Sequence, residues 1–298
     1  MKFQGMIPAV VTPFDAEGHV DTRSLTELVR CLIDAGVDGL VANGTMGEAG
    51  SLSRDERCTV VKAVVAAAEG RIPVAAGISA ATPEVAIAYA ADAAEVGAVG
   101  AMTLPPQLYG ADENEALAYF AALAESISLP LMVYNNPEAS GTDLRPSVLA
   151  LAADVDGIVA IKETSGDARR IAELVFAVGS RIDVLVGGDD CALEGAAAGA
   201  VGWVSGVANI APVECIAMWN AAAAGRLVEA REMYRRLLPL AQLDMTPKLV
   251  QYFKAALAAT GHDVGECRPP RLALNAQERE RLLKAVDALG PVATLQQA

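Results

Sequence analysis

The chain alternates short, uniformly apolar runs with longer segments whose apolar residues recur at helical spacing. The runs begin about 18–34 residues apart, which is the length of one strand–helix unit. None shows the polar alternation of a half-exposed strand, so they are typical of parallel strands covered on both faces. The predicted strands are 7–12, 39–43, 73–77, 100–104, 130–134, 158–162, 183–187 and 201–205.

Capping residues and glycines mark the predicted helices. Five apolar residues lie on one helical face after the first run, and Gly36 ends that helix. Either Asp21 or Ser24 caps its start. Thr82 with Pro83 begins a second helix. The apolar face of the first helix consists of Leu25, Leu28, Val29, Leu32 and Ile33.

A small internal repeat joins helix ends to strand starts. The sequence Gly-x-Val/Asp-Gly recurs in 36–39, 97–100 and 199–202, which indicates one supersecondary unit used repeatedly. Eight such units predict an α/β fold, a (β/α)8 TIM barrel over residues 1–211. The competing doubly wound sheet usually carries a G-x-G-x-x-G fingerprint, which this sequence lacks. Residues 212–298 are predicted as a helical appendage with helices at 212–224, 227–243, 247–260 and 276–289.

Composition and charge exclude several partner classes. The 298 residues include 23 Lys plus Arg against 37 Asp plus Glu, so the net charge is −14. Nucleic acid and anionic membrane surfaces require clustered cations, so neither is an expected partner. The uncharged run 195–213 contains glycines and a proline and is not predicted to span a membrane.

Histidine and cysteine offer little material for metal or triad chemistry. The five cysteines are scattered and form no C-x-x-C pair, and there are only two histidines. A disulfide framework, a zinc site and a Ser–His–Asp triad are therefore not expected. We expect no metal or organic cofactor, and the reducing cytoplasm is the predicted location.

Three reactive residues end predicted strands, where a barrel of this kind has its active site. Thr45 follows the second strand, Tyr134 ends the fifth and Lys162 ends the sixth. A lysine kept neutral by desolvation attacks a ketone to form a Schiff base. The alternative is an ion pair of Lys162 with Glu163 or another carboxylate.

Thr45 and Tyr134 each have two interpretations. The turn 44–48 could present Gly44, the hydroxyl of Thr45 and consecutive N–H groups to a carboxylate, or it could be an ordinary turn. Tyr134 could pass a proton, or its hydroxyl could simply face water.

Six segments occur in an order and at a spacing that are together highly specific. They are Gly5 with Val11-Thr12-Pro13-Phe14, Gly44-Thr45-Met46-Gly47-Glu48, Tyr134-Asn135-Asn136-Pro137 with Ser140-Gly141, Ile161-Lys162-Glu163-Thr164-Ser165-Gly166-Asp167, Gly188-Asp189-Asp190, and Gly202-Trp203-Val204-Ser205. The chain thereby resembles, over nearly its whole length, the class I aldolases of the dihydrodipicolinate synthase and N-acetylneuraminate lyase family.

The resemblance implies a lyase that acts on pyruvate or another 2-oxo acid. Lys162 would form the imine and Tyr134 would pass the proton. Thr45 and the N–H groups of Thr45 and Met46 would hold the carboxylate. A second tyrosine, for which Tyr109 is the candidate, would reach in from a neighbouring subunit of a homotetramer, a dimer of dimers. Gly188 and Asp190 would bind substrate hydroxyls.

Two departures from the family pattern change the expected substrate. Met46 replaces a proton-relaying threonine, and Ala139 stands where the synthase has an arginine for a distal carboxylate. Losing that contact would cost about 2–4 kcal/mol. We therefore predict aldol cleavage or condensation, or elimination of water or ammonia, rather than dihydrodipicolinate synthesis. The alternatives are 4-hydroxy-tetrahydrodipicolinate synthase despite the missing arginine, and a catalytically silent homologue that binds a 2-oxo acid.

Overall fold

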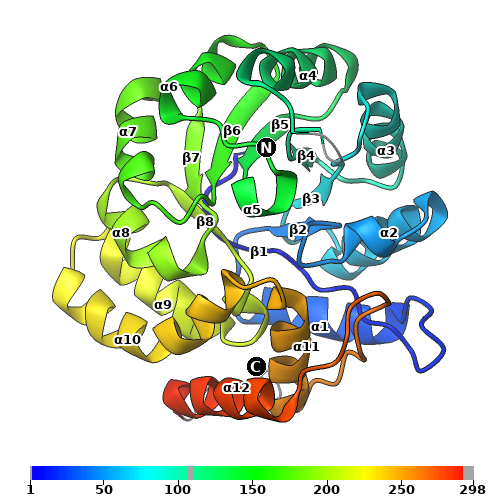
Figure 1. Cartoon of the computed structure of the whole chain (residues 1–298), viewed down its shortest axis with the longest axis vertical. Coiled ribbons are helices and arrows are strands. Elements are labelled where there is room, and N and C mark those ends of the chain that lie inside the picture. The colour runs from blue at the N-terminus through cyan, green and yellow to red at the C-terminus, as the bar shows by residue number, and fades with distance from the viewer. Residues whose placement is uncertain (1, 107–109, 291–298) are drawn as a thin grey trace.

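A parallel sheet of eight strands forms the centre of the molecule. The computed structural model describes residues 2–106 and 110–290. The strand order β1-β8-β7-β6-β5-β4-β3-β2 and the ring of helices in Figure 1 confirm the predicted barrel. Strands β1 to β8 are Gly5–Pro8, Leu40–Ala42, Val74–Gly77, Gly100–Thr103, Leu131–Asn135, Ile158–Glu163, Asp183–Val186 and Gly202–Ser205.

Helices surround this sheet and continue beyond its last strand. Those between strands are α1 (Thr22–Asp34), α2 (Arg54–Ala68), α3 (Pro83–Glu95), α4 (Glu113–Ser126), α5 (Pro137–Ser140), α6 (Pro146–Leu149), α7 (Arg169–Val178) and α8 (Ala192–Ala197). After β8 come α9 (Pro212–Ala223), α10 (Leu227–Asp244), α11 (Leu249–Ala259) and α12 (Ala276–Leu289). Short 3-10 turns are η1 (Ala49–Ser51), η2 (Ala150–Asp154), η3 (Asp189–Cys191) and η4 (Val207–Asn209).

The segment after β1 closes the barrel. The backbone N–H of Ala9 donates to Ser205 on one side at 2.8 Å, and that of Val10 donates to Val41 on the other at 2.9 Å. The prediction of the first strand at 7–12 is wrong in its bounds, because β1 ends at Pro8. The buried residues that follow Pro8 cross from β8 to β2 instead of continuing the pairing with β8. The other seven predicted strands agree with the structure to within about a residue at each end.

Local capping follows the predicted chemistry. The side chain of Asp21, rather than that of Ser24, caps α1 and accepts from the backbone N–H groups of Arg23 and Ser24. The glycines of the repeated joint, Gly36, Gly97 and Gly199, have φ of +94°, +100° and +99°. A side chain is disfavoured at such φ values, which explains why glycine recurs at each joint.

The C-terminal helices share the core of the barrel. Helix α9 packs on α8 and β1, and the rings of Trp203 in β8 and Trp219 in α9 lie 6.3 Å apart. In Figure 1, α9 to α12 gather along one side of the ring. We keep the division into 1–211 and 212–298 as a proposal about chain organisation.

A buried ion pair ties this appended region to the barrel. Lys254 Nζ in α11 lies 2.8 Å from Glu48 Oε1 in the turn after β2, and their side chains are only 3% and 0% exposed. Lys254 Nζ also donates to the carbonyl of Glu266 and lies 4.1 Å from the centre of the Phe14 ring. Burial lowers the pKa of Lys254, while Glu48 acts to raise it.

We expect Lys254→Met to destabilise the protein by about 3–5 kcal/mol, because it leaves the Glu48 carboxylate buried without its counter-charge. Methionine keeps most of the side-chain volume, so the loss measures charge rather than packing. Urea unfolding followed by circular dichroism gives the free energy of unfolding.

The matched control is Arg23→Met, which removes an ion pair with Glu27 whose side chains are 88% and 59% exposed. That change should cost less than about 1 kcal/mol. Adding Glu48→Gln to Lys254→Met should recover part of the loss. A loss for Lys254→Met as small as that of the control would contradict this prediction.

Candidate active site

Lys162 and Tyr134 lie side by side at the carboxyl end of the sheet. They are register partners in β6 and β5, and Lys162 Nζ lies 3.9 Å from the centre of the Tyr134 ring. Both are buried, with 5% and 4% of their surface exposed. The parallel pairing brings a potential nucleophile and a potential proton donor, which are separated in sequence, into contact.

Glu163 does not pair with Lys162. Its carboxylate lies on the other face of β6, where it accepts from Asn135 Nδ2 at 3.0 Å and from the backbone N–H of Ser165 at 2.7 Å. Within residues 2–106 and 110–290, Lys162 Nζ has no carboxylate oxygen within 4 Å. The ion-pair alternative for Lys162 is therefore wrong.

The hydroxyl of Tyr134 is held by a neighbouring side chain. Asn136 Nδ2 donates to Tyr134 Oη at 2.7 Å. Asn136 Oδ1 accepts from the N–H of Ala139 at 3.0 Å and caps α5. The interpretation of Tyr134 as a tyrosine whose hydroxyl faces water is wrong.

The turn from Gly44 to Glu48 is firmly anchored at the same end of the barrel. Thr12 Oγ1 donates to the carbonyl of Gly47 at 2.7 Å, and the N–H of Glu48 donates to Thr45 at 3.1 Å. In the described part of the chain, no protein acceptor takes the N–H groups of Thr45 and Met46. These donors and the half-buried Thr45 suit an anion.

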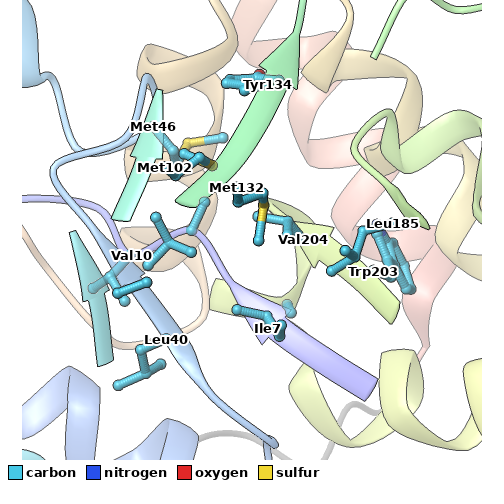
Figure 2. Close-up of a cluster of buried hydrophobic side chains, with 14 of the residues drawn as sticks. Ile7, Val10, Leu40, Met46, Met102, Met132, Tyr134, Leu185, Trp203 and Val204 are labelled. Carbon is cyan, nitrogen blue, oxygen red and sulfur yellow. The ribbon is translucent and has the colours of Figure 1, made fainter. Parts of the chain in front are cut away.

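The side chain of Met46 belongs to the core. It is 4% exposed and is part of the buried cluster drawn in Figure 2 with Met102, Met132 and Tyr134. Its Cε fills the space beside Gly206, where a Cβ would lie only 2.6 Å away. Met46 therefore contributes its backbone, and no side-chain hydroxyl, to the mouth of the barrel.

Asp189 is the hub of the turn after β7, and sequence reasoning gave it no role of its own. Its buried carboxylate accepts from Trp203 Nε1 at 2.8 Å and from the N–H groups of Gly206 and Val207 at 3.1 and 2.7 Å. Burial raises its pKa to about 6, although the Val207 N–H and other donors act to lower it.

The neighbouring Gly188 and Asp190 lie at the same rim. Gly188 precedes η3, and a Cβ there would come within 3.3 Å of Asp190 Oδ1. Asp190 is half-buried, burial raises its pKa, and its Oδ1 accepts no hydrogen bond from the residues that the structure describes.

Asp244 is a rim residue that the sequence did not reveal. It ends α10, which is held over the turn after β7 because Tyr234 Oη donates to the carbonyl of Asp189 at 2.9 Å. Burial and the charge of Asp189 raise the pKa of Asp244, and the Lys162 ammonium acts to lower it. No local pattern indicates that the end of this helix covers the barrel mouth.

Three further features concern the second tyrosine, metal binding and membrane spans. Tyr109 lies outside the described residues, 2–106 and 110–290. In those ranges there is no group of three or more His, Cys, Asp or Glu side chains that could hold a metal ion. No helix in the described chain is long and apolar enough to cross a membrane.

Comparison with known proteins shows the family to which this chain belongs. The family model of the dihydrodipicolinate synthetase family matches residues 2–289. The chain belongs to this family. It is 37% identical to the 4-hydroxy-tetrahydrodipicolinate synthase of Thermomicrobium roseum, with 98% of this chain and 96% of that protein covered. The chain is therefore a class I aldolase-type lyase, as the resemblance implies.

Solved structures agree. The dihydrodipicolinate synthase of Acinetobacter baumannii, solved with pyruvate, superposes with a TM-score of 0.92 at 33% identity over 97% of this chain and 99% of that one. A monomeric dihydrodipicolinate synthase variant gives 0.91 at 29% identity, with 97% of each chain covered. The names of these relatives favour our alternative, the synthase, over our main prediction of a different reaction.

We expect the stability that Asp189 contributes to be fully present below about pH 4 and to be lost as the pH rises through about 6. The carboxyl binds its proton more tightly in the folded state, where its pKa is about 6, than at its ordinary value of 3.8. The unfolding free energy of wild type relative to that of Asp189→Asn should fall by about 2 kcal/mol from pH 4 to pH 7.

Urea unfolding at each pH measures this difference. Asp156, an exposed carboxylate, supplies the control: Asp156→Asn should run parallel to wild type. A difference between wild type and Asp189→Asn that grows with pH would show that the three N–H donors, and not burial, dominate.

Proposed function

We propose that this protein forms a Schiff base between Lys162 and the keto carbon of pyruvate or a similar 2-oxo acid. The buried contact between Lys162 Nζ and the Tyr134 ring, with no competing ion pair among the residues that the structure describes, is the observation that supports it. The amine attacks C2, the carbinolamine loses water, and the protonated imine withdraws electrons from C3. Tyr134 supplies and removes the protons.

The 2-oxo acid carboxylate is proposed to bind at the turn after β2. The hydroxyl of Thr45, the N–H groups of Thr45 and Met46, and the small Gly44 form this subsite. Such donors place the keto carbon for attack and offset the repulsion that a net charge of −14 exerts on an anion. No cofactor is needed for these steps.

The names of the relatives support condensation to 4-hydroxy-tetrahydrodipicolinate as the reaction. A second candidate is cleavage or elimination on a 2-oxo acid whose distal part bears hydroxyl or amino groups. Ala139 in place of the arginine favours this second candidate, since no cation is supplied there for a distal carboxylate. Gly188 and Asp190 would then form the distal subsite, with a carboxylate that accepts hydrogen bonds.

Assembly and location remain proposals by analogy. We propose a homotetramer in which Tyr109 of one subunit completes the site of its neighbour, although one similar structure is of a monomeric variant. The cytoplasm stays our prediction. A silent homologue is disfavoured because Lys162, Tyr134 and Thr45 are all retained.

Pyruvate and borohydride should attach a single reduced adduct per chain at Lys162, because reduction traps the imine. Intact mass and peptide mapping locate the adduct. Lys162→Ala should give none, whereas Lys248→Ala should be labelled like wild type, because Lys248 is paired with Glu278. Labelling that survives Lys162→Ala would sink the proposal.

Ala139→Arg should separate the two candidate reactions. If the missing arginine limits synthesis, this variant should raise kcat/KM for 4-hydroxy-tetrahydrodipicolinate formation by roughly 30-fold or more and leave the KM for pyruvate unchanged. Wild type should then turn over hydroxylated 2-oxo acids better than the variant does. Efficient synthesis by wild type that Ala139→Arg does not improve would favour the synthase. Binding without turnover of any substrate would favour the silent homologue.

A further inference from the structure

Asn136 makes two side-chain hydrogen bonds that fix its orientation. Its Oδ1 must face the N–H of Ala139, because only the oxygen of an amide can accept that bond, at 3.0 Å. The Nδ2 group is thereby directed at Tyr134 Oη, 2.7 Å away. The residue is further held by its carbonyl, which accepts from Ser140 Oγ at 2.9 Å. The start of α5 thus sets which end of the amide meets the tyrosine.

This orientation decides where the proton of Tyr134 can point. A phenol has one O–H donor and two acceptor positions. Asn136 Nδ2 can only donate, so it occupies an acceptor position of Oη and cannot receive the hydroxyl proton. The O–H of a phenol lies in the plane of its ring, so the proton takes the in-plane direction away from Asn136 and remains available to a ligand. Lys162 Nζ lies over the face of the same ring, 3.9 Å from its centre. A residue that accepted from Oη would have the opposite effect.

We propose that Asn136 is a positioning residue, which holds the Tyr134 hydroxyl with its proton directed at the substrate during imine formation. It acts only through its hydrogen bond to Tyr134 Oη. This inference rests on the proposed function, because it gives the proton of Tyr134 a role in the reaction at Lys162. Capping of α5 is its second, structural task.

Asn136→Asp separates the two tasks. Aspartate caps a helix as well as asparagine does, so the folding of α5 is kept. Its carboxylate cannot donate, and it would instead accept the Tyr134 proton and withdraw it from the substrate. Asn136→Ala removes both the cap and the donor, and it reports the cost of the cap.

The experiment measures the rate of borohydride-trappable imine formation with pyruvate, together with kcat, KM and the melting temperature. In Asn136→Asp we expect imine formation and kcat to fall by about 10-fold or more, with the KM for pyruvate and the melting temperature nearly unchanged. In a Tyr134→Phe background, Asn136→Asp should have no further effect, because the two residues act as one unit.

The possible failures are distinct. Equal imine-formation rates in wild type and Asn136→Asp would overturn the role of Asn136 and leave the Lys162 chemistry intact. The same holds if Asn136→Asp lowers the rate of imine formation equally in the wild-type and Tyr134→Phe backgrounds. A loss that only tracks the melting temperature across Asn136→Asp and Asn136→Ala would reduce Asn136 to a cap. Absence of any Lys162 adduct in wild type would overturn the proposed function and this inference with it.

Discussion

Closure of one parallel sheet is the constraint on which the rest of the structure depends. The segment after β1 hydrogen-bonds Ser205 on one side and Val41 on the other, and so joins the two ends of the strand order. Because every strand runs in the same direction, all carboxyl ends meet at one rim. Residues as distant in sequence as Thr45, Lys162 and Asp189 are brought to that rim without any local sequence signal linking them.

The face of the sheet on which a side chain lies decides which charged groups meet at this rim. Successive residues of a strand point to opposite faces, so Lys162 faces the barrel mouth and Glu163 faces away from it. Glu163 accepts hydrogen bonds there from Asn135 and Ser165. Burial raises the pKa values of Asp189 and Asp244, although the charge of Lys162 acts through space to lower both. Among the residues that the structure describes, no carboxylate lies within ion-pair distance of Lys162, which agrees with the proposed Schiff-base chemistry.

Family membership and local chemistry answer different questions about this protein. Membership shows the enzyme class, a class I aldolase-type lyase, and the lysine, the tyrosine and the glycine-bounded turn of the family's motifs are all present. In our proposal, the distal part of the substrate is selected by other positions, among them Ala139 and Asp190. They carry a carboxylate and no arginine, which favours a substrate whose distal part bears hydroxyl or amino groups. The names of the relatives favour the substrates of the synthase instead.

The sequence by itself determined the strand and helix scheme and the reactive strand ends, because apolar runs, caps and glycine joints depend on neighbouring residues. It misplaced the first strand and left Lys162 with a carboxylate partner as an alternative, because both depend on contacts across the barrel. Only the tertiary structure joined Glu48 to Lys254, placed Asp244 over the mouth and turned the Asn136 amide towards Tyr134. Those arrangements are decided by the packing of helices on a closed sheet, which no single segment of sequence encodes.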